Sequence, residues 1–382
     1  MKKIIIISNT SWFVYNFFRA SITDLMENGK QVYVLAPEDE YSHLLVKLGC
    51  NYRPINVDRS GANPFDELST VIQLIKMIYQ IKPICILNFT PKMNIYGVIA
   101  GRLNGVKVIN SIAGLGSIFT DKGIKSVLGK FLLSLTQPFA HHIVFQNTND
   151  WRVYLKHKLT TRIKSSHKHG IGIDLKHFKP HQAPDDGVVR FVLVARMLKT
   201  KGVHYFVDAA KLVDAFYAEK KRQGEIVPQY EFSLLGFVDS GNPQGISLST
   251  LQDWHDNTIV NYLGETDDVY SVVKGQDCVV LPSYYREGVP QSLIEACAMA
   301  KPIITTDNVG CRETVAHNKT GYIVDKQCAE SLKEAMINMI ELSHQERIAF
   351  GLKGRRKAER KFCHLKIAHH YNYLINKLNE EL

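Results

Sequence analysis

Features that mark several large classes of protein are missing from this sequence. Its seven cysteines form no C-x-x-C pair and no Cys/His cluster with the spacing of a zinc site. Their number is odd and most lie in apolar runs, so we expect reduced core residues in a reducing, cytoplasmic compartment. No stretch reaches the roughly 18 apolar residues of a transmembrane helix. The apolar run 4–7 predicts a buried strand because it is too short for a signal peptide.

Two signatures of cofactor and metal binding are also missing. A G-x-G-x-x-G dinucleotide fingerprint is absent, and its nearest match, Gly170-x-Gly172, lies in a stretch with linker composition. No carboxylate pair or Asp-x-Asp motif indicates a divalent cation. We therefore expect neither a cofactor nor a metal.

Acidic residues are scarce in the first half of the chain. Residues 1–180 hold 23 Lys and Arg against 11 Asp and Glu, a net charge of +12, whereas residues 181–382 have a net charge of −2. This asymmetry indicates an anionic partner for the first half: nucleic acid, a membrane surface or phosphate. A solvated basic face without a partner is the alternative.

The chain alternates short β-branched runs with longer stretches of helical period, which predicts βαβ units and parallel sheets. With 382 residues, two domains are expected. The pattern pauses at about 170–188, where Gly and Pro gather, and restarts at Val188. We predict an α/β protein of two doubly wound Rossmann-like domains, 1–180 and 181–364, facing across a cleft. The last segment, 365–382, is expected to be a helix packing back towards the first domain.

The first candidate site follows the restart strand, in the stretch from Arg196 to Gly202. Ligands of open parallel sheets bind beyond the carboxyl ends of strands. Arg196 and Lys201 lie there, in a loop that leads into a helix. Two cations beside helix N–H groups can hold phosphate, although a lone Arg/Lys pair can equally be solvated.

The second candidate site contains two glutamates, Glu287 and Glu295, in the pattern E-x7-E. Glu287 lies in a loop after a buried strand, and a helix begins near Pro290, where proline is tolerated. Glu287 lies at the mouth of the helix and Glu295 roughly 7–9 Å along it, at 1.5 Å per residue, so the two are too far apart to share a proton. The pair suits hydroxyl-rich groups at the two ends of one ligand. Apolar neighbours make free exposure of Glu295 improbable, and an unpaired buried carboxylate is costly.

A third loop, 308–313, follows the next strand and on its own predicts only a turn into a helix. Together the three loops describe one edge of a sheet and a ligand with a central diphosphate. A nucleotide-sugar has that shape. Its leaving diphosphate would be stabilised by cations and helix dipoles.

These motifs resemble retaining glycosyltransferases of family 4, which have the two-domain GT-B fold. A narrower branch, which builds bacterial surface glycans on undecaprenyl diphosphate and includes N-acetylgalactosaminyltransferases, is similar in four segments: Asn63-Pro64-Phe65, Thr90–Gly97, Gly114-Leu115-Gly116 and Leu281–Glu287. The resemblance implies a hexosyltransferase that moves a hexose or N-acetylhexosamine from a UDP-sugar to a polyprenyl-diphosphate-linked saccharide.

The resemblance also implies roles for individual residues. Arg196 and Lys201 would bind the diphosphate and stabilise it as leaving group. Glu287 would contact the donor sugar near the reacting centre, and Glu295 would bind the ribose hydroxyls. Backbone groups would cap a phosphate at Gly288, Val289, Pro290 and Gln291. In the first domain Lys92, Gly114, Leu115 and Gly116 would face the acceptor side.

Two departures from the family pattern concern the acceptor. Ser8–Trp12 stands where many relatives have a glycine pair, and Pro91 stands where some have a histidine. Acceptor identity therefore stays open, and no histidine role is carried over.

The segment 122–133 mixes basic and apolar residues at helical spacing. It predicts either contact with an anionic bilayer or an ordinary amphipathic helix packed on the first sheet. We expect a peripheral protein on the inner face of the cell membrane. The alternatives are a transferase with a soluble acceptor, a sugar-nucleotide 2-epimerase, an inactive scaffold and a basic nucleic-acid-binding protein. The last would leave the paired glutamates unexplained, so no nucleic-acid partner is expected.

Overall fold

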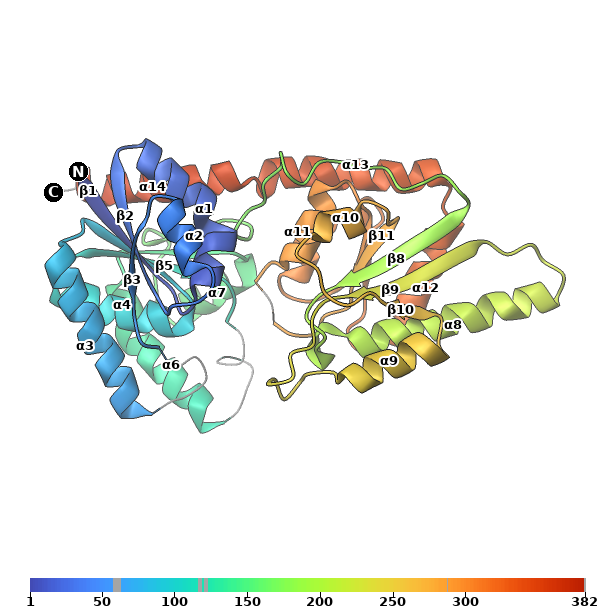
Figure 1. Ribbon diagram of the computed structural model, residues 1–382, viewed down its shortest axis with the longest axis horizontal. Coiled ribbons are helices and arrows are strands. Elements are labelled where there is room, and N and C mark those ends of the chain that lie inside the picture. Colours follow the sequence, from blue (N-terminus) through green and yellow to red (C-terminus); the bar gives the residue numbers. More distant parts are fainter. Residues whose placement is uncertain (58–62, 116–118, 120–122, 287, 381–382) are drawn as a thin grey trace. The chain divides into compact units, whose positions relative to one another are not determined.

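The computed structural model describes residues 1–57, 63–115, 119, 123–286 and 288–380 (Figure 1). Packing divides the chain into two compact units, Met1–Gly172 with Phe362–Leu382, and Ile173–Lys361. The sequence placed the divisions at 180 and 364. The linker composition extends to Gly187, but the chain already belongs to the second unit at Ile173, which is buried.

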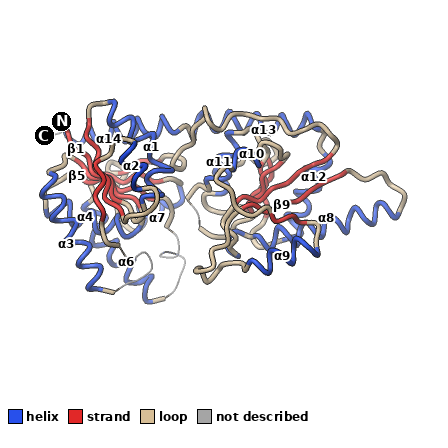
Figure 2. Tube along the Cα trace, viewed as in Figure 1, coloured by secondary structure: helices blue, strands red, loops and turns tan. Residues whose placement is uncertain are grey.

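The first unit is a seven-stranded parallel sheet with helices on both faces (Figure 2). Its elements are β1 (Lys2–Ile7), α1 (Ser11–Glu27), β2 (Lys30–Ala36), α2 (Ser42–Lys47), β3 (Asn51–Pro54), α3 (Pro64–Ile81), β4 (Cys85–Phe89), α4 (Pro91–Leu103), β5 (Lys107–Ile112), α6 (Ile124–Thr136), the 3-10 turn η1 (Gln137–Phe139), β6 (His142–Phe145), α7 (Thr148–Lys156), β7 (Ser165–His167) and the C-terminal α14 (His364–Glu380). The strand order is β3-β2-β1-β4-β5-β6-β7.

The two faces of the first sheet are covered by different helices. In β1, Ile4 and Ile6 join one core cluster with α1 and α14, whereas Ile5 and Ile7 join another with α3, α4 and α7. Successive side chains of a strand point to opposite faces, so an unbroken isoleucine run is what a doubly covered strand requires.

The second unit is a six-stranded parallel sheet in the order β10-β9-β8-β11-β12-β13. Its elements are β8 (Val188–Val194), η2 (Lys199–Lys201), α8 (Val203–Arg222), β9 (Gln229–Leu235), α9 (Leu248–Asn257), β10 (Val260–Tyr262), α10 (Val269–Val273), β11 (Cys278–Leu281), α11 (Gln291–Ala298), β12 (Ile303–Thr306), η3 (Cys311–Glu313), β13 (Gly321–Val324), α12 (Ala329–Glu341) and α13 (His344–Lys361). This order, read from the first strand of the unit, is the doubly wound order 3-2-1-4-5-6.

None of the helices within the described ranges is long and apolar enough to cross a membrane.

Candidate active site

The strand order of the second unit defines where a ligand can bind. β8 pairs with β9 on one side and with β11 on the other, so the chain reverses direction across the sheet at β8 and β11. The loops after these two strands diverge, and the crevice between them is where doubly wound sheets bind ligands. Arg196 and Lys201 follow β8, and Gly288, Val289, Pro290 and Gln291 follow β11, so the fold brings the predicted cations and the predicted phosphate cap to one edge.

The loop after β8 is fixed to the segment that follows β9. The Met197 N–H donates to the Phe237 carbonyl oxygen at 3.0 Å, and the Met197 carbonyl accepts from Ile246 at 2.9 Å. This anchoring buries Met197 and leaves Arg196 exposed, where its guanidinium pairs with Asp239 at 3.1 Å. Lys201 is half-buried at the end of η2. The charge of Arg196 is thus compensated by Asp239, a residue that no motif in the sequence indicated.

The loops after β8 and β11 are in direct contact. The Thr200 carbonyl oxygen accepts from the Tyr284 N–H at 3.1 Å and from the Ser283 hydroxyl at 3.2 Å. Gly202, at φ 77°, packs against the Pro282 backbone. The position of the loop before α11 is therefore set by the loop that carries the two cations.

The loop after β12 supports the loop after β11 from its other side. The Asn308 side-chain amide donates to the carbonyl oxygens of Ser283 (3.3 Å) and Tyr285 (2.6 Å), and Thr306 donates to Ser283 at 2.5 Å. The sequence predicted only a turn here. The structure shows that Asn308 holds the backbone that leads to Glu287, which itself lies outside the described residues.

α11 begins at Gln291, after Pro290, and carries Glu295 in its second turn. Glu295 is half-buried among fully buried apolar neighbours. This burial raises the pKa of the Glu295 carboxyl to about 8, and a hydrogen bond from Gln291 acts in the opposite direction. Near neutral pH, a carboxyl with this environment can accept hydrogen bonds from ligand hydroxyls or donate one to them.

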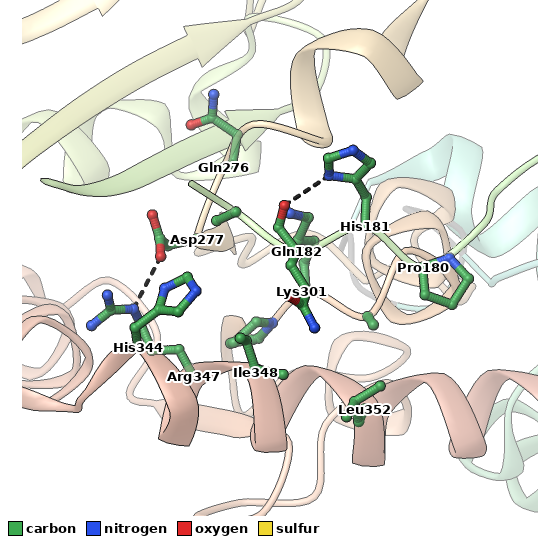
Figure 3. A pocket seen from close by; sticks show the side chains of 13 residues that line it. Pro180, His181, Gln182, Gln276, Asp277, Lys301, His344, Arg347, Ile348 and Leu352 are labelled. Atoms are coloured by element: carbon green, nitrogen blue, oxygen red, sulfur yellow. Dashed lines mark hydrogen bonds and ion pairs between the residues drawn. The ribbon is translucent and has the colours of Figure 1, made fainter. Parts of the chain in front are cut away.

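A separate hollow of about 320 Å³ lies at the amino ends of β11 and β12, on the opposite edge of the same sheet (Figure 3). Its charged groups are occupied within the fold: Asp277 pairs with Arg347 at 3.0 Å, and Lys301 donates to the Lys274 carbonyl oxygen at 2.7 Å. We assign this cluster to stability.

The predicted acceptor-side residues lie near the carboxyl edge of the first sheet. Lys92, in the first turn of α4, pairs with Glu67 of α3 at 2.5 Å, and Tyr96 donates to the same carboxylate. Burial, together with Glu67, raises the pKa of the Tyr96 hydroxyl. Glu67 was not foreseen, although its place one turn after Asn63-Pro64 in the helix that packs on α4 offered a signal.

Gly114 and Leu115 follow β5 and line a small hollow. The Leu115 N–H donates to the Asp150 carboxylate at 3.2 Å, and Asp150 is itself held by Asn147 at the start of α7. Gly116 lies outside the described residues. Thr90 and Asn94 also line this hollow.

Two family models match the chain, and each matches one half. Residues 3–147 match "Glycosyl transferase 4-like" and residues 175–357 match "Glycosyl transferases group 1". The chain therefore belongs to the glycosyltransferases of family 4 with the GT-B fold.

Relatives in sequence and structure agree with this family. The chain is 28% identical over 349 residues, 86% of each chain, to the N,N'-diacetylbacillosaminyl-diphospho-undecaprenol alpha-1,3-N-acetylgalactosaminyltransferase of Campylobacter jejuni. It is 23% identical over 72% of its length, and 71% of the relative's, to an Escherichia coli UDP-Gal:alpha-D-GlcNAc-diphosphoundecaprenol alpha-1,3-galactosyltransferase. A Rickettsia africae glycosyltransferase structure superposes with a TM-score of 0.80 at 16% identity, covering 100% of this chain and 99% of that one. The likeness to that structure shows the fold.

Proposed function

We propose that this protein is a retaining, metal-independent glycosyltransferase that moves a hexose or N-acetylhexosamine from a UDP-sugar to a polyprenyl-diphosphate-linked saccharide. The observation that carries the proposal is the convergence of Arg196, Lys201 and the start of α11 at the switch point of the second sheet. The two named relatives, which act on undecaprenyl-diphosphate-linked saccharides, support the choice of acceptor.

The donor would bind with its diphosphate at the amino end of α11. Helix N–H groups and the helix dipole favour an anion there, and Arg196 and Lys201 add full positive charges. Glu295, one turn further along the same helix, would bind the ribose hydroxyls. For Arg196 to engage the diphosphate, its pair with Asp239 must open or be shared, at a small energetic cost because both side chains are partly exposed.

Transfer would proceed through an oxocarbenium-like transition state with Glu287 near the donor sugar. The departing diphosphate, stabilised by Arg196 and Lys201, would take the proton of the acceptor hydroxyl on the same face of the sugar. The new bond then forms on the face that the diphosphate leaves, which retains the anomeric configuration. Electrostatic stabilisation of the leaving group supplies most of the rate in this scheme. Trapping of a glycosyl-enzyme adduct on a carboxylate of the first unit would contradict it.

The decisive experiment incubates the protein with a panel of UDP-sugars and polyprenyl-diphosphate-linked saccharides and detects product by mass. Lys201→Ala and Glu287→Ala should each remove most activity while circular dichroism stays unchanged. Lys199→Ala, at an exposed position two residues away, is the matched control and should retain activity. Near-normal turnover of either test variant would reject the assigned roles.

A thermal-shift comparison separates this proposal from its alternatives. UDP should raise the melting temperature more than GDP or ADP, because UDP is the proposed leaving group. A shift with nucleic acid alone would favour a nucleic-acid-binding protein. Transfer to free sugar phosphates or polysaccharide ends, but not to lipid-linked saccharides, would favour a soluble acceptor. Epimerised UDP-sugar without transfer would favour a 2-epimerase.

We also propose that the first unit contacts an anionic membrane. α6 exposes Val127, Leu128, Phe131 and Leu135, which share one face of the helix, and Phe139 follows directly in η1. Each is 52–65% exposed. Monomeric soluble proteins rarely gather large apolar side chains in this way, and basic amphipathic helices insert such a face into the lipid interface.

The first unit has a second exposed apolar face, which lies on α3. Like α6, α3 packs on α4 (Figure 1). Its members are Phe65, Leu68, Ile72 and Tyr79, which are 43–82% exposed, with Lys76 between them. The surrounding chain is strongly basic, since 16 Lys and Arg but only 3 Asp lie between Lys76 and Lys179. Apolar insertion and attraction to anionic lipid would therefore act together.

Flotation with anionic liposomes tests membrane contact. We expect binding at low salt that Phe131→Asp reduces strongly and that Ile226→Asp, at an exposed apolar residue of the second unit, leaves unchanged. No flotation of the wild-type protein at low salt would reject the membrane proposal and leave the enzyme proposal standing.

A further inference from the structure

Side chains from the end of β12 continue the pairing of β11 beyond the last residue of that strand. Leu281 ends β11, and its carbonyl oxygen accepts from the Thr305 hydroxyl at 2.7 Å. The next residue but one, Ser283, has a carbonyl oxygen that accepts from the Thr306 hydroxyl. Thr305, Thr306 and Ser283 are fully buried, so these hydrogen bonds are shielded from water.

Asn308 makes the outermost contacts of this series. An asparagine amide carries two N–H donors, and this one donates to the carbonyl oxygens of Ser283 (3.3 Å) and Tyr285 (2.6 Å). Its Oδ1 accepts from the Val309 N–H at 3.0 Å. Exchanging the amide nitrogen and oxygen would break all three hydrogen bonds, so the orientation of this buried side chain is fixed.

The same segment, 283–285, is bonded to the loop after β8 as well. The Thr200 carbonyl oxygen accepts from the N–H groups of Tyr284 (3.1 Å) and Tyr285 (3.3 Å) and from the Ser283 hydroxyl (3.2 Å). Lys201 follows Thr200 directly, and the chain beyond Tyr285 leads into α11. The segment 283–285 therefore connects the two groups that would hold the diphosphate, Lys201 and the amino end of α11.

We propose that Asn308 is a positioning residue of the diphosphate site, which fixes the segment 283–285 and thereby the spacing between Lys201 and the amino end of α11. A diphosphate that contacts both groups depends on that spacing, because charge-assisted hydrogen bonds weaken when donor and acceptor are moved apart. Asn308 acts through the backbone and does not touch the ligand. This inference deepens the proposed function, on which it rests for the identity of the ligand.

Calorimetry with UDP and with UMP tests the role of Asn308. Asn308→Ala removes both amide donors, and Asn308→Asp would place a carboxylate oxygen against two carbonyl oxygens. We expect UDP affinity to fall at least about tenfold in both variants, which corresponds to the loss of one hydrogen bond to a charged group. UMP has a single phosphate and does not depend on the spacing, so its affinity should stay within about twofold. A merely structural role would lower both affinities alike.

Thr305→Val is the matched control. It removes a buried hydrogen bond of the same series, but at Leu281, which the backbone pairing of β11 with β12 also holds. Like the Asn308 variants, it should lower the melting temperature, yet it should leave the ratio of UDP to UMP affinity unchanged. Circular dichroism verifies that each variant is folded.

Hydrogen exchange provides a readout that needs neither ligand nor transfer. The amides of Tyr284 and Tyr285 should exchange faster in Asn308→Ala than in the wild-type protein and Thr305→Val. If the wild-type protein binds UDP but transfers no sugar, the proposed function fails and the affinity ratio still decides the role of Asn308. An unchanged ratio in the Asn308 variants, unchanged exchange at both amides, or no UDP binding by the wild-type protein would overturn the proposal.

Discussion

A β-carbon on Gly202 would lie 2.2 Å from the carbonyl oxygen of Pro282, far inside van der Waals contact. Because the obstacle is backbone, Gly202→Ala must displace either the loop before α11 or the loop that carries Arg196 and Lys201. We expect this substitution to abolish UDP binding. We also expect it to lower the free energy of unfolding by more than about 1–2 kcal/mol, which is the cost of a left-handed alanine by itself. Calorimetry with UDP and urea titration measure both effects.

Gly224→Ala is the matched control for Gly202→Ala. Gly224 has φ 84° and no atom within 4 Å of its would-be β-carbon, so it isolates the backbone penalty from the collision. Equal loss of UDP binding in both variants would show that the contact with Pro282 does not position the site.

The raised pKa of Glu295 makes stability depend on pH. An unfolded glutamate ionises near pH 4.5, but burial holds the folded carboxyl neutral up to about pH 8. The stability that the neutral form contributes is therefore complete below pH 4.5 and is lost as the pH rises to about 8. Relative to Glu295→Gln, wild-type unfolding free energy should fall between pH 5 and pH 8 and level off above. Urea titrations at pH 5.5, 7 and 8.5 measure this, and a pH-independent difference would reject the assigned pKa.

Asp277 and Arg347 form a buried ion pair, so removing one partner leaves the other charge buried and unpaired. Arg347→Met should lower the free energy of unfolding by about 3–5 kcal/mol, and the double variant with Asp277→Asn should recover part of that loss. Arg222→Met, at the exposed Arg222–Glu219 pair, should cost less than about 1 kcal/mol. No recovery in the double variant would argue against charge burial as the cause.

Thr90 precedes α4 in a backbone conformation that threonine rarely adopts, with φ 77° and ψ 149°. Thr90→Gly relieves this strain and is expected to raise the free energy of unfolding by about 1 kcal/mol. Thr10→Gly should not be stabilising, since Thr10 has ordinary extended dihedral angles and makes a capping bond. A lower melting temperature for Thr90→Gly would contradict the strain argument.

The fold was predictable because its main strands are continuous apolar runs. Ile4–Ile7 and Cys278–Leu281 stand out in the sequence since both faces of each strand are covered. The short edge strands β3, β7 and β10 were not predicted, because three or four half-polar residues at a sheet edge carry no periodic signal. The first turn of α4 carries no clear helical signal either, since Thr90-Pro91 suggests an extended segment.

In the candidate site the sequence located the two cations at the sheet edge, but it did not indicate the residues that contact them. Arg196 and Lys201 could be placed because position after a strand implies the sheet edge. Asp239, Glu67 and Asn308 act through contacts between residues 20 or more positions apart, which no local pattern encodes. The roles of all the proposed site residues in binding and catalysis stay predictions, and Glu287 and Gly116 also lie outside the described residues.

α14 fills a place in the first unit that the N-terminal residues leave open. Ile367, Tyr371, Leu374 and Ile375 pack into the same core as β1 and α1. During synthesis α14 must therefore leave the ribosome before the first unit can close its core, and α14 is made after all the residues of the second unit. The half of the protein made first becomes the half that finishes folding last.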